Sequence, residues 1–281
     1  MRLAVSSFAW PPERRSAIGR CLRRLALVEG VELVLPMAFA DPVRATVDEI
    51  AEERHFWHDH GIEVVSVQSL VFGRPELQLF GDGAVRAELI DHLVRMAEVA
   101  AACGAARMVF GSPASRLRHG LSMPEAMKIA TDLFRHLGER IAPLGVVVCV
   151  EPNPSIYAGC DFVNRIEEAV ALVREVGHPA VRVQMDTGAI AQAMRDGSPP
   201  VPAAVLEAAH WSGHMHLSVP GLELLHSGDE EQAAIARMGA PWSGINWASI
   251  EMRTPKEADH CQLITEAVQA VSVWYPLGTN T

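Results

Sequence analysis

The sequence predicts a single (β/α)₈ barrel that spans residues 1–281. Eight short runs rich in β-branched and apolar residues alternate with longer runs that have the periodicity of amphipathic helices. Several of the short runs, such as VVVCV and VRVQM, are apolar on both faces, which is typical of a parallel sheet covered by helices. Hydrophobic residues make up 49% of the chain, so it can form one large core.

The predicted elements follow one another along the chain. The strand-like runs are residues 2–9, 31–36, 63–69, 107–112, 145–151, 181–186, 214–219 and 246–252. The clearest helix covers residues 84–103, where apolar residues recur at three- and four-residue steps and Gly104 provides a stop. Ser122 and Glu125 form a capping box that predicts the start of another helix. The Pro-rich segment 198–204 predicts a loop or a break inside the sixth helical segment.

A doubly wound open sheet is the alternative arrangement for alternating strands and helices. When such a sheet binds a nucleotide, a glycine-rich turn normally follows its first strand. Here the first strand leads into SSFAWPPE, which lacks that fingerprint. No low-complexity linker or run of charge divides the sequence, so we expect one domain.

Charge and cysteine content narrow the functional class. The formal net charge is −10, from 34 acidic and 24 basic residues, which argues against a nucleic-acid partner. The five cysteines are scattered without a CxxC pair, so we expect reduced thiols and a cytoplasmic location. The N-terminal segment lacks the long apolar stretch of a secretion signal. Because no stretch approaches the ~18 apolar residues of a membrane span, we expect no membrane association.

Four side chains of types that bind metals lie at the ends of the last four predicted strands. Glu151 ends the fifth strand, and Asp186 ends the sixth. His216 lies on the seventh strand, and Glu251 lies near the end of the eighth. Successive members are about one βα unit apart, roughly 30 or more residues. We expect them to converge, because active sites of (β/α)₈ barrels form at the carboxyl ends of the strands.

The chemistry of these four residues favours a metal ion. Three carboxylates brought together without a cation would repel one another, and one would have to take up a proton. Three oxygen donors and one imidazole favour Mn²⁺, with Mg²⁺, Co²⁺, Fe²⁺ and Zn²⁺ as alternatives. Taken singly, each carboxylate could cap a helix or pair with an arginine, and His216 could be a structural histidine. Their recurrence in four successive units favours one divalent ion.

Four more polar residues are candidates for contacts around the site. His214 shares a face with the seventh-strand ligand and lies one layer deeper, where it orients that ligand or packs as a hydrogen-bonded histidine. Arg253 lies nearer the mouth, where it holds a substrate oxygen or phosphate or pairs with a carboxylate. Gln68 and Glu32 lie near strand ends in apolar runs, where they bind sugar hydroxyls or neighbouring backbone.

The segments VVCVEPNP, VQMDTG, HMHLS and WASIEM resemble the metal-binding strand ends of the xylose isomerase-like TIM barrels. This superfamily contains the sugar phosphate isomerases and epimerases together with endonuclease IV-type proteins. The resemblance follows nearly the whole chain in order and spacing. It implies that Glu151, Asp186, His216 and Glu251 are the four metal ligands. It also implies that Glu151 and Glu251 are the catalytic pair, as the ligand glutamates are in the family's 3-epimerases.

The carboxylate pair suits isomerisation next to a carbonyl. One carboxylate can remove a proton from the carbon, and a second on the other face can return it. We therefore expect a metal-dependent isomerase or epimerase acting on a small carbohydrate: a sugar, keto-sugar or related polyol derivative. The alternatives are a metal-dependent dehydratase or lyase of a keto-sugar or inosose, and a non-catalytic barrel that binds a sugar or a partner protein. The sequence leaves the oligomeric state open, and a homo-oligomer is one alternative because barrel helices often mediate dimers.

Three positions depart from the ketohexose epimerases that the sequence resembles. Ala189, Tyr157 and Leu222 stand where those epimerases carry a histidine, a glutamate and an arginine. Endonuclease IV-type enzymes use more histidines and carboxylates for several zinc ions, whereas few of the 12 histidines here stand at strand ends. Without these three polar partners the hydroxyls of a free ketohexose would lack hydrogen bonds, and Tyr157 also offers an apolar ring face as a substrate contact. We therefore expect an oxidised, cyclic, phosphorylated or aglycone-bearing sugar instead of a free ketohexose.

Overall fold

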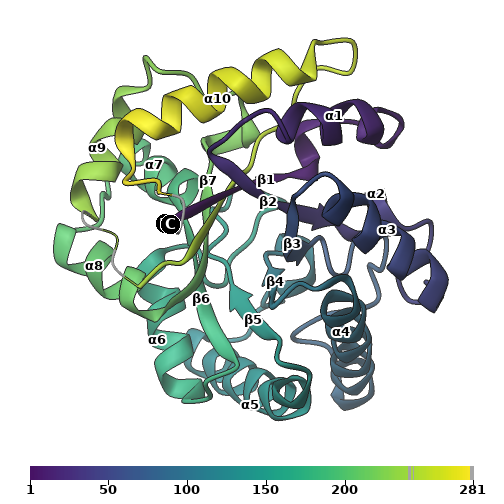
Figure 1. Ribbon diagram of the computed structural model, residues 1–281. Coiled ribbons are helices and arrows are strands. Elements are labelled where there is room, and N and C mark those ends of the chain that lie inside the picture. The colour runs from purple at the N-terminus through teal and green to yellow at the C-terminus, as the bar shows by residue number, and fades with distance from the viewer. Residues whose placement is uncertain (240–241, 243, 279–281) are drawn as a thin grey trace.

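The computed structural model describes residues 1–239, 242 and 244–278, which form a closed barrel of eight parallel strands (Figure 1). The strands are β1 (Arg2–Ser6), β2 (Val28–Val34), β3 (Glu63–Gln68), β4 (Arg107–Phe110), β5 (Val147–Val150), β6 (Val181–Asp186), β7 (Ser212–Leu217) and β8 (Trp247–Ile250). They pair in chain order, and β8 closes the barrel against β1. Each strand overlaps one of the predicted runs, so the (β/α)₈ prediction is confirmed.

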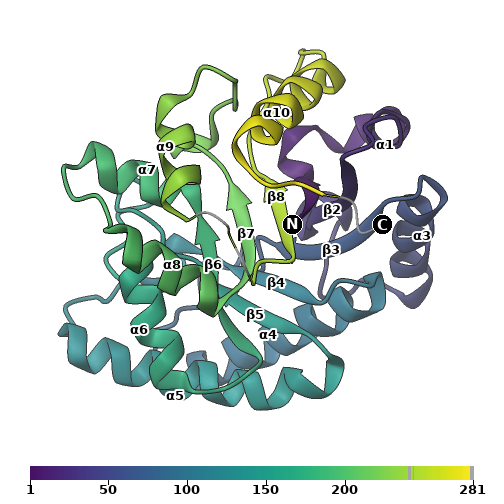
Figure 2. The ribbon, with the colours of Figure 1, turned by 60° about the vertical axis from the view of Figure 1, so that its left-hand side comes forward.

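The longer helices form a ring outside the strands, as the two ribbon views show (Figures 1 and 2). The helices are α1 (Arg15–Leu22), α2 (Leu35–Ala38), α3 (Val47–Asp59), α4 (Gly83–Cys103), α5 (Met123–Ile141), α6 (Ile166–Val176), α7 (Thr187–Arg195), α8 (Pro202–Trp211), α9 (Glu230–Met238) and α10 (His260–Trp274). The predicted helix 84–103 is α4, which Gly104 ends in the left-handed conformation with a φ of 97°. The predicted capping box of Ser122 and Glu125 starts α5. The Pro-rich segment separates α7 from α8, as predicted.

The inward-facing positions of several strands are polar, although the strands themselves are buried. Along β7, His214 and His216 alternate with Met215 and Leu217, and the latter two belong to the hydrophobic core. Neighbouring side chains of a strand point to opposite faces, so the two histidines face the barrel axis. The register pairs Asp186 of β6 with His216, which places these two strand ends at the same height. Polar groups from separate strands therefore meet inside the barrel near its carboxyl-terminal mouth.

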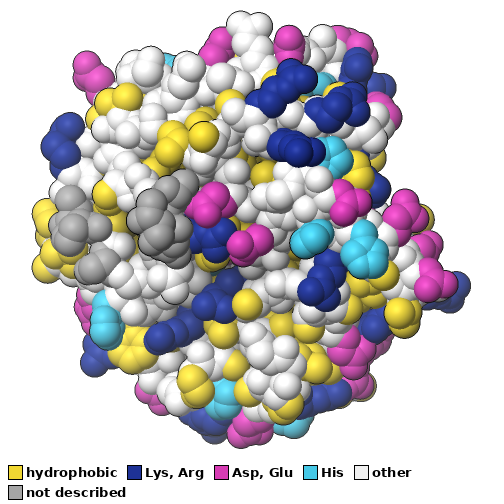
Figure 3. All heavy atoms as spheres, in the orientation of Figure 1, with side chains coloured by type: hydrophobic (Ala, Val, Ile, Leu, Met, Phe, Trp, Pro, Cys, Tyr) yellow, Lys and Arg dark blue, Asp and Glu magenta, His cyan; other side chains and the backbone are white. Residues whose placement is uncertain are grey.

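Figure 3 shows basic and acidic side chains interspersed on one face of the molecule. Among residues 1–239, 242 and 244–278, no helix is long and apolar enough to cross a membrane.

The cysteine pairing corrects the expectation of reduced thiols. Cys21 of α1 and Cys261 of α10 form a disulfide, because closure of the barrel packs the first helix against the last. The two residues are 240 positions apart, so their spacing carries no local signal of the bond. The other three cysteines, Cys103, Cys149 and Cys160, are free and buried. The cysteine pattern therefore no longer supports a cytoplasmic location, which stays a prediction.

We expect the disulfide to stabilise the fold, because it ties the two ends of the barrel together. A bond that closes a loop of this length contributes about 2–5 kcal/mol. Cys21→Ser should lower the free energy of unfolding by about this amount in a urea titration without reductant. The unmodified protein in reductant should behave like the variant. Thiol titration of the oxidised, unfolded protein that finds five free thiols would contradict the bond.

Candidate active site and metal centre

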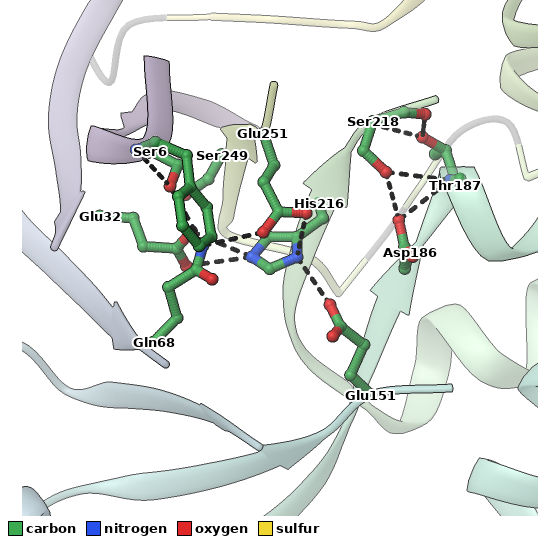
Figure 4. Close-up of polar contacts among 12 residues, drawn as sticks. Ser6, Glu32, Gln68, Glu151, Asp186, Thr187, His216, Ser218, Ser249 and Glu251 are labelled. Carbon is green, nitrogen blue, oxygen red and sulfur yellow. Dashed lines mark hydrogen bonds and ion pairs between the residues drawn. The ribbon is translucent and has the colours of Figure 1, made fainter. Parts of the chain in front are cut away.

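Three of the four predicted metal ligands meet in a buried cluster at the mouth of the barrel (Figure 4). Glu151 and Glu251 come directly after β5 and β8, and His216 is the second-last residue of β7. The Nδ1 atom of His216 lies 2.8 Å from Glu151 Oε1 and 3.3 Å from Glu251 Oε2. One ligand atom from each residue lies within 4.8 Å of the others. Two carboxylates from separate strands therefore approach the same imidazole nitrogen.

Asp186, the fourth predicted ligand, lies at the edge of this cluster. Its carboxylate accepts hydrogen bonds from the backbone N–H groups of Gly188 at 2.9 Å and Ala189 at 3.2 Å. The hydroxyl of Ser218 donates to the same carboxylate at 2.6 Å. Burial and the charge of Glu151 raise the pKa of Asp186 to about 6. Asp186 thus caps α7 here, and its role as a metal ligand stays a prediction.

Glu32 of β2 belongs to the site, although its sequence position did not mark it as a member of the cluster. It is fully buried, and its two carboxylate oxygens lie 3.0 and 3.1 Å from His216 Nε2. The Ser66 hydroxyl donates to Glu32 at 2.8 Å, and the Gln68 amide donates at 2.7 Å. His214 Nε2 lies 3.5 Å from Glu32 Oε2. The sequence signal for this residue was a glutamate inside the apolar run VELVLP. That signal did not show that His216 is the partner of Glu32.

His216 separates acidic groups on its two sides, as Figure 4 shows. Burial alone would lower the pKa of His216, but the charges of Glu251 and Glu32 raise it well above its usual value. Burial would raise the pKa of Glu32, but His216 and His214 hold it well below its usual value. Burial raises the pKa of Glu251 to about 8, opposed by the charge of His216 and assisted by that of Glu151. A divalent cation would relieve the same repulsion among buried carboxylates, so this donor set fits a metal ion.

Glu151 is held in place by its neighbours. The Asn153 amide donates to Glu151 Oε2 at 2.9 Å, while Oε1 faces the imidazole. Gly111, just beyond β4, leaves the space that this carboxylate occupies. A Cβ atom at Gly111 would overlap Glu151 Oε2 and would lie 3.4 Å from Asn153 Oδ1. The absence of a side chain at this glycine therefore lets the carboxylate turn toward His216.

Two of the predicted substrate contacts lie within the buried network. His214 is fully buried, and its Nε2 atom lies 2.8 Å from Ser249 Oγ and 3.3 Å from Ser66 Oγ. His214 therefore lies within the hydrogen-bonded interior of the barrel, and its predicted contact with a substrate stays a prediction. Gln68 Nε2 lies 2.9 Å from Glu251 Oε1 as well as contacting Glu32, so this amide links two carboxylates.

The other two predicted contacts, Tyr157 and Arg253, lie closer to solvent. The Tyr157 hydroxyl accepts a hydrogen bond from the Gly221 N–H at 2.8 Å, which joins the loops that follow β5 and β7. Burial raises the pKa of Tyr157 to about 12, and the charge of Asp186 adds to the shift. Arg253 is exposed, and its guanidinium carbon lies 5.1 Å from the centre of the Phe8 ring. Both side chains therefore border the mouth, where a substrate would enter.

The fold is a (β/α)₈ barrel, and its cluster of buried carboxylates and imidazole lies at the carboxyl-terminal mouth, where barrel enzymes have their active sites. The family model described as xylose isomerase-like TIM barrel matches residues 26–253, and the chain belongs to this family. The family prediction is therefore confirmed. A search of curated proteins found no match.

Several solved structures share the fold over nearly the whole chain. A D-psicose 3-epimerase from Clostridium cellulolyticum H10, solved with D-tagatose, has a TM-score of 0.76 at 15% identity, covering 97% of this chain and 98% of that chain. A 3-keto-D-glucoside 4-epimerase from E. coli has a TM-score of 0.73 at 17% identity, covering 97% and 99%. The IOLI protein with a bound zinc atom has a TM-score of 0.68 at 18% identity, covering 98% and 100%. At these identities the similarity establishes the fold.

Proposed function

We propose that this protein is a divalent-metal-dependent isomerase or epimerase of a sugar, keto-sugar or related polyol derivative. The observation that carries the proposal is the approach of Glu151 and Glu251 to the same nitrogen of His216. The family and the fold of its sugar-epimerase neighbours support the same class of reaction. Because the sequence identity to these neighbours is low, we infer the substrate from the residues of this chain.

The metal would be held by Glu151, Glu251 and His216 Nδ1, with Asp186 as the fourth ligand. Three oxygen donors with one imidazole keep Mn²⁺ as the proposed ion, with Zn²⁺ among the alternatives. When bound, such an ion supplies polarisation of the substrate carbonyl. The Nε2 atom of His216 faces the Glu32 carboxylate, so Nδ1 would be the nitrogen that gives up its proton and binds the ion.

The two glutamates carry the proton transfer. One carboxylate removes the proton from the carbon next to the carbonyl, and the other returns a proton to the opposite face. Each is positioned by its own amide: Asn153 contacts Glu151, and Gln68 contacts Glu251. The carboxylates come from separate strand ends, β5 and β8, so they would reach the reacting carbon from different directions.

Metal analysis followed by NMR in D₂O tests the proposal. We expect about one divalent ion per chain after careful reloading. Incubation with a panel of sugars and keto-sugars should exchange the proton at the reacting carbon for deuterium without loss of water. A product that has lost water would identify a dehydratase or lyase instead. Reloaded protein without stoichiometric metal would contradict the metal site, and metal-loaded protein that neither exchanges a proton nor converts any sugar of the panel would favour a binding barrel.

A further inference from the structure

A cavity of about 970 Å³ opens beside the candidate active site. Its lining includes residues at or just beyond the ends of five neighbouring strands: Phe8, Val34, Ser69, Ser112 and Arg253. These residues follow β1, β2, β3, β4 and β8, whereas three of the predicted metal ligands come from β5, β6 and β7. The cavity therefore occupies the half of the mouth that faces those ligands.

Two short chain segments place the wall of the cavity next to the proposed catalytic carboxylates. Ser69 lines the cavity and directly follows Gln68, whose amide lies 2.9 Å from Glu251 Oε1. Arg253 also lines it and stands two residues beyond Glu251. A substrate with its reacting carbons between Glu151 and Glu251 would therefore extend into this space.

The size and lining of the cavity differ from what one sugar ring needs. Its volume lies near the upper end of the roughly 300–1,000 Å³ that sites for drug-sized ligands occupy. Most of the wall is apolar or aromatic, and its larger side chains are Phe8, Trp10, Met37, Val71 and Phe72. Phe72 is 74% exposed, so its ring is open to contact with a ligand. The wall also carries hydroxyl and amide groups, from Ser69, Gln78, Ser112, Ser115 and Thr254, but its exposed area is mainly apolar, and an aromatic ring would pack against that area.

Basic side chains at the rim are a second feature of the cavity. Arg74 lines the cavity but is paired with Glu76 and Glu88. Arg253 and Lys256 also line it, and neither forms an ion pair with an acidic group in the described part of the chain. The Arg253 guanidinium lies against Phe8, so a cation and an aromatic face are presented together. This combination suits a ligand that is largely apolar and carries an acidic group at its outer end.

We propose that the substrate is a sugar derivative with a large apolar or aromatic substituent, and that this cavity holds the substituent. The proposal deepens, and rests on, the proposed isomerase or epimerase function. The sugar lies between Glu151 and Glu251, and the substituent lies against Phe8, Met37 and Phe72.

Binding of unreactive glycosides tests this assignment without requiring turnover. Methyl, phenyl and 4-carboxyphenyl β-D-glucosides and β-D-galactosides would be titrated into metal-loaded protein by calorimetry. We expect the phenyl glycosides to bind about tenfold more tightly than the methyl glycosides, which corresponds to about 1.4 kcal/mol. The 4-carboxyphenyl glycosides should bind more tightly still at low salt and lose this advantage in Arg253→Ala.

A matched pair of variants locates the effect. Phe72→Ala should remove most of the preference for phenyl over methyl glycosides, while Val273→Ala should leave it unchanged. Val273 of α10 is 76% exposed and lies outside the residues that line the cavity, so it controls for loss of an exposed apolar side chain. Equal binding of methyl and phenyl glycosides, no binding by any of them, or an unchanged preference in Phe72→Ala would overturn the proposal. Metal content and proton exchange in D₂O would report separately on the proposed function.

Discussion

Replacing Glu251 with glutamine should reduce turnover by about 100-fold or more, and replacing Glu151 should have an effect of the same size. Glutamine keeps the shape of the side chain but cannot take up or return the proton of the substrate. Both carboxylates approach His216 Nδ1 from separate strands, so neither is placed to replace the other. Initial rates on the substrate found in the sugar panel would measure the loss.

The glutamine variants can also weaken the metal, because each glutamate is a proposed ligand. Metal content must therefore be measured in the same preparations, and rates must be compared at saturating Mn²⁺. Glu257→Gln serves as the control, since Glu257 is an exposed residue of the loop that follows β8. We expect this variant to keep full activity. Full activity in a metal-replete Glu251→Gln protein would refute the role of Glu251 in proton transfer.

The sequence predicted which residues lie at the mouth of the barrel better than it predicted which side chains contact one another inside the barrel. Glu151, His216 and Glu251 could be found because each βα unit returns the chain to the same end of the barrel, so spacing alone brings strand ends together. Asp186 was predicted by the same rule, but the orientation of its carboxylate depends on the start of α7 and on Ser218. The spacing of strand ends in the sequence does not show which groups the Asp186 carboxylate bonds to.

Contacts across the barrel are less accessible to sequence reasoning. Glu32 and His216 lie on strands that are not neighbours, and their contact depends on the tilt and stagger of the strands around the closed sheet. The disulfide between Cys21 and Cys261 depends on closure in the same way. A pattern of apolar residues predicts which face of a strand is buried. It does not predict which inward-facing side chains of distant strands lie at one height.

Because Glu32 contacts His216 on the side away from Glu151, we expect Glu32→Gln to weaken divalent metal binding by about 10–100-fold. The Glu32 carboxylate accepts the Nε2–H of His216 and so holds the ring with Nδ1 toward the two carboxylates. Glutamine removes the negative charge that strengthens this hydrogen bond and that makes His216 Nδ1 a better metal ligand. Its amide group also places a donor next to donors from Gln68 and Ser66, which disturbs the buried network.

Calorimetric titration with Mn²⁺ and Zn²⁺ would measure the affinity of the Glu32→Gln variant, and urea unfolding without metal would show whether the fold survives. Ser66→Ala is the matched control, because it removes one hydrogen bond to Glu32 but keeps the carboxylate against His216. We expect Ser66→Ala to change metal affinity by less than about tenfold. Unchanged dissociation constants for both ions in a folded Glu32→Gln protein would show that His216 does not need this carboxylate, and that the contact between them serves only the packing of the barrel interior.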